Sequence, residues 1–235
     1  MNKIGIIGAM EIELETLKSH MQITNTLEKA SMSFLEGTLN HTPVVIVKSG
    51  IGKVNAGMCV QILVDIFHVT HIINTGIAGS LNAVIDIGDI VLSTDALYHD
   101  VDATGFGYPI GEIPQLGTLS FQADSQMIAL AKSSCEAVNP DIKVFQGRIV
   151  TGDQFVSSPS VKDNILRNFP GSFCTEMEGA AIANASWLNH IPFIIIRAIS
   201  DKADDSAHMD YPAFEKAAAE HSAKLVEHMV ERIVD

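Results

Sequence analysis

Short apolar runs rich in β-branched residues alternate with helical patterns along the whole chain, and this alternation restricts the fold more than any other feature. The runs are continuously apolar, which is typical of strands covered on both faces. They predict strands at Lys3–Ile7, Pro43–Val47, His71–Asn74, Asp89–Ser93, Val144–Val150 and Phe193–Ile199.

Helical patterns fill the intervals between these runs. They predict helices at Glu11–His20, Val54–Phe67, Ser125–Val138, Val161–Asn168, Glu178–Asn189 and Pro212–Val234. In the last helix one face would carry Phe214, Ala218, Leu225, Met229 and Ile233. Strand–helix alternation of this kind predicts an α/β fold with a largely parallel sheet. Since the 235 residues contain no linker or internal repeat, we expect a single domain, 1–235.

Composition excludes several classes of partner. The formal net charge of −13 argues against non-specific binding to nucleic acid or to anionic membranes. No run approaches 18 apolar residues, the N-terminus lacks the pattern of a signal peptide, and the three cysteines form no CxxC, so a reducing cytoplasm is expected. Only 18% of the residues are charged and 47% are hydrophobic, which fits either an oligomer interface or a dense core.

Glycines and acids follow several of the predicted strands. In open α/β sheets ligands bind beyond the carboxyl ends of the strands, and glycine allows a ligand close to the backbone. Such segments are Gly8–Glu13, Ser49–Gly52, Thr75–Gly79, Thr151–Phe155 and Ser200–Asp201. Tight turns are the alternative explanation of the glycines alone. Together with the acids they favour a site for a small polar ligand.

Three acids are candidates for chemistry, each with a purely structural alternative. Glu13 falls in the first turn of a predicted helix, where an acid also complements the helix dipole. Glu178 completes a Thr-x-x-Glu pattern, which is also a capping box. Asp201 directly follows a very apolar strand, and strand ends face the ligand crevice.

The distribution of cations bears on the ligand. The chain has four arginines, at positions 148, 167, 197 and 232, and the glycine segments match neither a P-loop nor GxGxxG. Sites for free phosphate or polyphosphate usually employ arginine forks or the P-loop lysine. Although Lys48 and Lys53 remain available, the pattern favours a ligand that is uncharged where it reacts.

Taken together, the segments resemble a known family. The stretches IGIIGAMEIE (4–13), KSGIGKVNA (48–56), INTGIAG (73–79), YHDVDATGFGYPIGEIP (98–114), TGDQF (151–155), EMEGAAIA (176–183) and RAISDKAD (197–204) are similar, in order and spacing, to bacterial 5′-methylthioadenosine/S-adenosylhomocysteine nucleosidases. These belong to the wider purine nucleoside phosphorylase/hydrolase family. The resemblance implies a three-layer α/β/α domain with a mixed, largely parallel sheet.

The resemblance also implies a reaction of methionine salvage and the activated-methyl cycle. Water would cleave the N-glycosidic bond between adenine and a 5′-thio-substituted ribose, and 5′-deoxyadenosine is a further expected substrate. Glu13 would be the general base and Asp201 the general acid at adenine N7. By analogy with glycoside hydrolysis, such a carboxylate pair suits an oxocarbenium-like transition state. We expect an apolar setting to raise the pKa of Asp201 while Glu13 stays ionised.

Binding roles follow from the same resemblance. Glu178 would bind the ribose 2′-hydroxyl, Met177 would pack on the sugar, and Phe155 would stack on adenine. The Val156 backbone would bind the edge of adenine, and the Gly79 backbone would lie in the purine/ribose loop. Ser200 and Arg197 would orient Asp201 and the polar side of the site. The 5′-alkylthio pocket would be lined by Met10, Ile51, Phe106 and Tyr211. Phe106 would come from the other subunit of a homodimer. No metal and no organic cofactor is implied.

Other readings remain open from the sequence alone. A phosphorylase of the same fold would use phosphate in place of water, and a close relative would act on aminodeoxyfutalosine. A non-catalytic nucleoside-binding domain would use the carboxylates only as hydrogen-bond acceptors. A dinucleotide-binding Rossmann domain would need the fingerprint that this chain lacks.

Overall fold

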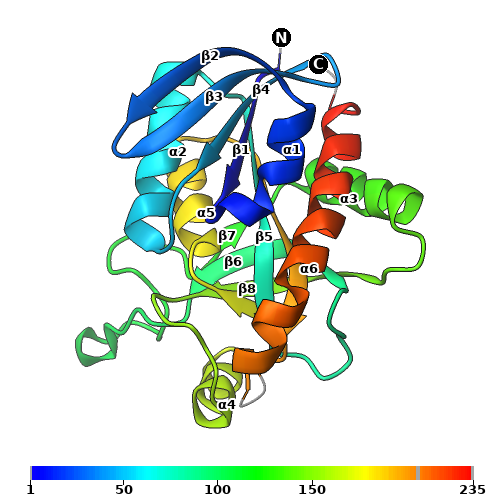
Figure 1. Cartoon of the computed structure of the whole chain (residues 1–235). Helices are drawn as coiled ribbons and strands as arrows, with labels where there is room; N and C mark the ends of the chain where they lie inside the picture. Colours follow the sequence, from blue (N-terminus) through cyan, green and yellow to red (C-terminus); the bar gives the residue numbers. More distant parts are fainter. Residues whose placement is uncertain (1, 205–206, 234–235) are drawn as a thin grey trace.

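Strand β1 (Ile4–Gly8) illustrates how the sheet is covered on both faces (Figure 1). Successive side chains of a strand point to opposite faces. Ile4 and Ile6 accordingly pack into one hydrophobic cluster, with helix residues such as Leu17, Met127 and Leu225, whereas Ile7 packs into another, with Leu63 and Ile182. The continuous apolar run therefore reflects a strand buried on both sides, as predicted.

The computed structural model describes residues 2–204 and 207–233. Its strands are β1, β2 (Gln22–Lys29), β3 (Met32–Leu39), β4 (Thr42–Lys48), β5 (His71–Ser80), β6 (Ile90–Tyr98), β7 (Phe121–Gln122), β8 (Val144–Thr151), β9 (Ser172–Glu176) and β10 (Phe193–Asp201). Its helices are α1 (Glu15–His20), α2 (Lys53–Phe67), α3 (Ser125–Val138), α4 (Pro159–Asn168), α5 (Gly179–Leu188) and α6 (Ala207–Val230), with short 3₁₀ turns η1 (Glu11–Glu13) and η2 (Thr104–Phe106).

All strands join one mixed sheet in the order β10-β6-β8-β9-β5-β1-β4-β3-β2, with β7 on β6. An additional pairing of β10 with β5 closes the strands β5, β9, β8, β6 and β10 into a ring. Strand β1 pairs in parallel with β4 and β5, as β10 does with β5 and β8 with β6. Antiparallel pairs join β10 to β6, β2 to β3, β3 to β4, β5 to β9 and β6 to β7. The sheet is therefore mixed. Most of its antiparallel pairs involve β2, β3, β7 or β9, which are not among the six predicted strands, so the sheet has more antiparallel pairing than the sequence indicates.

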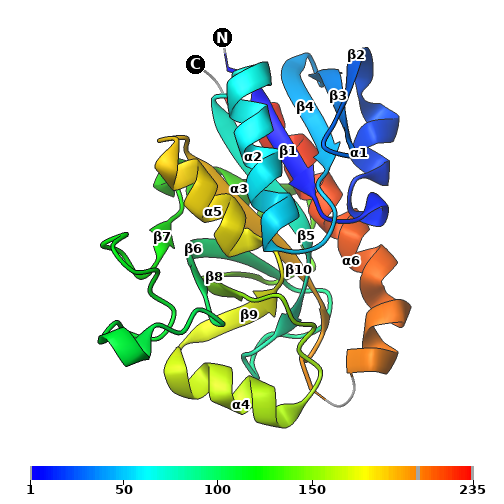
Figure 2. The same ribbon diagram turned by 90° about the vertical axis from the view of Figure 1, so that its left-hand side faces the viewer.

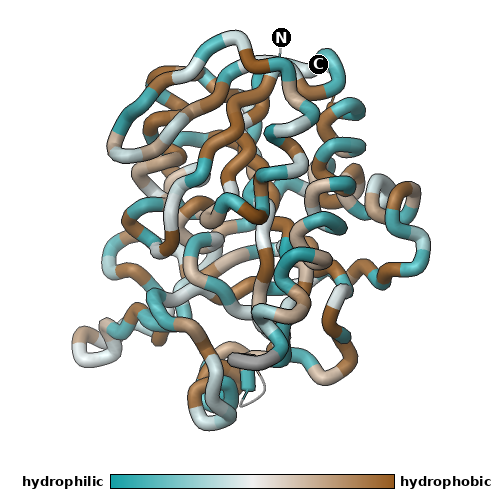
Figure 3. The backbone as a smooth tube through the Cα atoms, viewed as in Figure 1, coloured by the Kyte–Doolittle hydropathy of each residue, from teal (hydrophilic) through white to brown (hydrophobic). Residues whose placement is uncertain are grey.

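Helices cover the sheet on two sides (Figure 2). α2 and α5 pack together on one side, and α3 and α6 pack together on the other. Between these helices, the central strands carry strongly hydrophobic residues (Figure 3). The three-layer α/β/α arrangement with a mixed sheet is thus confirmed.

The six predicted strands are all present, extended at their carboxyl ends by one to several residues. The first predicted helix is split into η1 and α1, and the last begins at Ala207; its predicted end at Val234 lies outside the described residues. Of the residues predicted to share one face of this helix, Ala218, Leu225 and Met229 are buried, whereas Phe214 is 43% exposed.

Residues 99–120 form a long, largely irregular segment that carries η2 and projects from the body of the molecule in both views (Figures 1 and 2). Within the described residues, no helix has the length and apolarity needed to cross a membrane.

Candidate active site

The carboxyl ends of β1, β5 and β10 lie at one edge of the sheet because these three strands pair in parallel. A cavity of about 470 Å³ opens at this edge. All the predicted site residues except Val156, Arg197 and Phe106 line it, namely Met10, Glu13, Ile51, Gly79, Phe155, Met177, Glu178, Ser200, Asp201 and Tyr211.

Glu13 is held by backbone donors. Its Oε2 accepts from the N–H groups of Ala9 at 2.7 Å and Met10 at 2.9 Å, and its Oε1 accepts from Ile77 N–H at 3.2 Å. It therefore caps its own turn at the position where an acid also complements the helix dipole, but it reaches β5 inside the cavity as well. Burial raises the pKa of the Glu13 carboxyl, while Arg197 and the three N–H groups oppose that rise.

Asp201 ends β10 and is 1% exposed. Ser200 Oγ donates to its Oδ2 at 2.9 Å, and the Ala203 N–H donates to its Oδ1 at 2.8 Å. Burial raises the pKa of Asp201, and these two hydrogen bonds act against the rise. An apolar setting therefore acts on Asp201 as expected, but the pKa of Glu13 is raised too, since Glu13 is also buried.

Two glycines of β5 make room for these carboxylates. A Cβ at Gly76 would lie 2.6 Å from Glu13 Oε1, and a Cβ at Gly79 would lie 2.7 Å from Asp201 Oδ1. Since a strand rises about 3.3 Å per residue, the two carboxylates approach β5 at positions that lie roughly 10 Å apart along the strand. The glycines of the INTGIAG segment thus serve close approach by acids and not a turn, since both lie inside β5.

Glu178 immediately precedes α5, and its side chain makes no capping bond. Its Oε1 instead accepts from the N–H of Gly52, across the cavity, at 2.8 Å. The capping-box explanation of Glu178 is therefore wrong. Burial and the neighbouring Glu176 raise the pKa of Glu178 to about 8.

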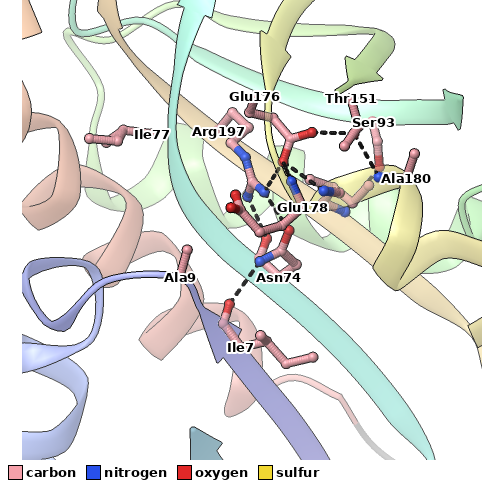
Figure 4. A network of polar contacts seen from close by, with 12 residues as sticks. Ile7, Ala9, Asn74, Ile77, Ser93, Thr151, Glu176, Glu178, Ala180 and Arg197 are labelled. Atoms are coloured by element: carbon pink, nitrogen blue, oxygen red, sulfur yellow. Dashed lines mark hydrogen bonds and ion pairs between the residues drawn. The ribbon is translucent and has the colours of Figure 1, made fainter. Parts of the chain in front are cut away.

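The carboxylate that caps α5 is Glu176, which the sequence-based reasoning does not single out. Its Oε2 accepts from the N–H groups of Gly179 at 2.7 Å and Glu178 at 3.2 Å, and it pairs with Arg197 Nη2 at 2.6 Å (Figure 4). The signal was present in FIIIRAI, because an arginine inside a buried strand requires a carboxylate partner.

Comparison with known proteins decides the family. The model of the phosphorylase superfamily matches residues 3–231. The 5′-methylthioadenosine/S-adenosylhomocysteine nucleosidase of Staphylococcus haemolyticus is 40% identical over 227 residues, covering 97% of this chain and 98% of that one. The chain belongs to this nucleosidase family.

Solved nucleosidase structures agree over the whole fold. The Neisseria meningitidis enzyme in complex with methylthio-immucillin-A superposes with a TM-score of 0.95 at 39% identity, covering 99% of this chain and all of that one. The Colwellia psychrerythraea enzyme in complex with adenine also gives 0.95, at 40% identity, covering 99% and 96%.

In this member of the nucleosidase family an apolar wall faces the carboxylates. The rings of Phe155 and Tyr211 meet edge to face with centroids 5.7 Å apart, and the Tyr211 hydroxyl donates to Met10 Sδ at 3.2 Å. Ile51 and Met177 complete the wall. Val156 lines a small adjoining pocket together with Gly79 and Asp201.

The remaining two predicted residues of this nucleosidase lie outside the cavity lining. Arg197 donates to Asn74 and Glu176, so it supports the polar side of the site, whereas Ser200 supports Asp201. Phe106 is 85% exposed on η2, outside the lining of its own chain's cavity. Its predicted role in the pocket of a second subunit stays a prediction.

Proposed function

We propose that this protein, as one domain spanning 1–235, hydrolyses the N-glycosidic bond of 5′-methylthioadenosine and S-adenosylhomocysteine and releases adenine. The observation that carries this proposal is a single cavity with Glu13 near one end, Asp201 near the other and Glu178 among its walls. The related enzymes bind adenine and methylthio-immucillin-A, which suits a cavity of this composition.

The reaction divides charge between the two ends of the cavity. As the bond breaks, positive charge develops on the ribosyl ring and negative charge on the departing adenine. Asp201, protonated, transfers its proton to adenine N7. Glu13, ionised, accepts a proton from the water that attacks C1′. The separation of roughly 10 Å along β5 leaves room for the ring and the water between the two groups.

The other walls hold the substrate. Glu178 accepts a hydrogen bond from the ribose 2′-hydroxyl, and in its ionised form it stabilises the positive charge that develops on the sugar. Phe155 supplies an aromatic face for adenine, and the Val156 backbone lies beside it to bind its edge. Met10, Ile51 and Tyr211 form the apolar surface for a 5′-alkylthio group.

Water, and not phosphate, is the nucleophile in this proposal. Among the described residues that line the cavity none is lysine or arginine, and the guanidinium of Arg197, behind it, is paired with Glu176. Bound phosphate normally relies on such cations. In phosphate-free buffer we expect adenine from both nucleosides at an undiminished rate. A requirement for phosphate would show a phosphorylase, and release only from aminodeoxyfutalosine would move the substrate to that class.

A homodimer belongs to the same proposal. Val54 and Leu188 are 73% and 56% exposed, and they line one groove between α2, α5 and residues 101–113. Exposed apolar area of this kind marks an interaction surface. A second copy would cover it and place Phe106 at the partner's cavity. Sedimentation should give twice the monomer mass, and Val54→Asp should yield monomers that bind the nucleosides more weakly.

The state of the cysteines bears on the cellular compartment of the enzyme. Cys59, Cys135 and Cys174 are free and buried, which supports the expected reducing cytoplasm. 5′-Deoxyadenosine carries no sulfur but fits the same apolar wall, so the assay of released adenine includes it as a third nucleoside.

A further inference from the structure

One buried cation, Arg197, lies behind the cavity lining, close to three carboxylates that are part of it. The Arg197 side chain is 2% exposed, and Glu13, Glu176 and Glu178 are each less than a tenth exposed. One positive charge cannot neutralise three negative charges at once. Whichever carboxylate pairs with Arg197 therefore decides how easily the other two ionise.

The geometry gives Arg197 to Glu176. Its Nη2 lies 2.6 Å from Glu176 Oε2, while Glu13 and Glu178 accept their hydrogen bonds from backbone N–H groups. Nη2 also donates to the side-chain oxygen of Asn74, whose Nδ2 donates to the carbonyl of Ile7 at 2.9 Å (Figure 4). The guanidinium is thereby held between β9, β5 and β1.

Glu176 is fixed on its other side as well. Thr151 Oγ1 donates to Glu176 Oε1, and Thr151 Oγ1 itself accepts from the Ala180 N–H at 2.8 Å. Together with its bonds to the N–H groups of Gly179 and Glu178, the carboxylate holds the first turn of α5. Glu178 lies at the start of that turn and points to Gly52.

We propose that Glu176 is a positioning residue of the nucleosidase reaction: by holding Arg197 and the backbone N–H of Glu178, its carboxylate withholds the buried cation from Glu13 and Glu178 and aims Glu178 into the cavity. The inference rests on the proposed function for its kinetic part, but the sharing of charge is a property of the ligand-free protein.

The charges around Glu178 give this a measurable consequence. Burial and then Glu176 on β9 raise the pKa of Glu178 to about 8; the Gly52 N–H and Arg197 on β10 oppose the rise, and Glu13 on η1 adds to it. The charge of Glu176 also tends to raise the pKa values of three other groups, namely Tyr98, His99 and Cys174. Without the charge of Glu176, repulsion disappears and Arg197 is freed, so the pKa of Glu178 must fall.

Glu176→Gln tests this, because glutamine keeps the size and an acceptor oxygen but not the charge. Carbon-13 titration of the glutamate carboxyls in the ligand-free protein should show the Glu178 midpoint fall by about one unit or more. In kinetics, kcat should fall at least about tenfold, more than KM rises, and the acid limb of kcat/KM should move to lower pH.

Two further variants separate charge from structure. Glu176→Asp keeps the charge but shortens the side chain, so kcat should fall while the acid limb stays. Asp95→Asn is the matched control, because Asp95 forms a similar ion pair with Arg148, 2.6 Å long, outside the cavity lining. It should lower stability without moving the Glu178 midpoint or the acid limb.

The outcomes are distinct. An unshifted Glu178 midpoint in Glu176→Gln overturns the inference, even if turnover is lost. If Glu176→Gln does not fold, wild-type kcat in Glu176→Asp overturns it instead, and a reduced kcat with an unmoved acid limb supports it. A shifted midpoint in Glu176→Gln, together with a wild-type protein that releases no adenine, supports the charge sharing and refutes the proposed function.

Discussion

The two ends of the cavity hold their carboxyl groups in different ways. At the Glu13 end, a carboxylate is bound by three backbone N–H groups and lies near the guanidinium of Arg197, with Glu176 and Glu178 close by. At the Asp201 end, one carboxyl has a hydroxyl and one N–H as partners. The acids Asp210 and Asp204 raise its pKa further, although the cation Lys162 is also near it.

This difference suits opposite tasks. Backbone donors and a cation favour the ionised form of a carboxyl, which a base needs, whereas burial among acids favours the protonated form, which an acid needs. Burial raises the pKa of both Glu13 and Asp201. The two carboxyls therefore differ in the hydrogen bonds and charges that act against the effect of burial on the pKa. Changing these interactions one end at a time is the way to test the assignment.

The largest expected effects come from removing the acid and the base. Asp201→Asn and Glu13→Gln should each lower kcat at least about a hundredfold, since general acid–base catalysis typically supplies that much. Adenine release under saturating nucleoside measures it. Near-normal turnover in either variant would exclude that residue from its role.

A change of leaving group distinguishes the two losses. A 5-thioriboside with a phenolate leaving group needs no protonation as it departs, so the defect of Asp201→Asn should shrink on this substrate. The defect of Glu13→Gln should persist, because water must still be activated. Equal rescue of both variants would contradict the division of labour between the ends.

The two ends were also predicted from the sequence with unequal success. The central strands are buried on both faces and are therefore continuously apolar in the sequence. These apolar runs predicted the strands, and with them the sheet edge at which both Glu13 and Asp201 lie. Glu176 was missed because its partners, Arg197 and Thr151, are distant in sequence, and only the folded sheet brings them together.

The hairpin β2–β3 was missed for a different reason. Along β2 almost every residue is exposed, so the strand has no apolar run and is held by its pairing with β3 alone. Strand β9 is mostly buried and paired on both sides, but three of its five residues are the polar Ser172, Thr175 and Glu176, so it has no apolar run either. Polar strands of this kind carry no hydrophobic period for a sequence to reveal.

A second prediction uses the two glycines of β5. Gly79→Ala would place its Cβ 2.7 Å from Asp201 Oδ1 and 2.9 Å from the Cβ of Ala203, so both the carboxylate and the turn after β10 must shift. Gly76→Ala meets the end of the longer Glu13 side chain at 2.6 Å. We expect about a tenfold loss of kcat/KM or more at both positions, and a greater loss at Gly79.

Near-wild-type kcat/KM in both glycine variants would show that the carboxylates need not approach β5 as closely as they do. Gly57→Ala is the matched control, because a Cβ there has no neighbour within 4 Å.

A third prediction concerns stability at the Glu13 end. The pKa of Glu178 is about 8 in the folded protein and about 4.3 in an unfolded chain. The folded state therefore binds more protons between these values, and stability falls as pH rises through them. Glu178→Gln removes this loss while keeping an oxygen that accepts from Gly52.

At pH 8 the Glu178→Gln variant should therefore be more stable than the wild type by about 1 kcal/mol or more, or roughly 2–4 °C in Tm for a chain of this size. At pH 4.5 the two should be alike, although turnover is impaired. Calorimetry at both pH values measures the difference, and equal Tm values at pH 8 would contradict the raised pKa.

The smallest effect is expected at the Asp201 end, where the Ser200 hydroxyl lowers the pKa of Asp201 that burial raises. Ser200 Oγ donates to Asp201 Oδ2 at 2.9 Å and so lowers the pKa of that carboxyl. Without the hydroxyl the pKa rises, and because Asp201 acts in its protonated form, the alkaline limb of kcat should move to higher pH. A hydrogen bond to a charged group contributes about 1.5 kcal/mol and one pKa unit is about 1.4, so Ser200→Ala should shift the limb by roughly one unit or less. Below the limb, kcat should stay within about twofold of the wild type.

Ser93→Ala removes an equally buried hydroxyl outside the cavity lining, which accepts from the Ile195 N–H, and should leave the limb in place. If Asp201 acted ionised instead, the same rise in its pKa would move an acid limb to higher pH and leave the alkaline limb in place, which would reverse the roles of the two ends.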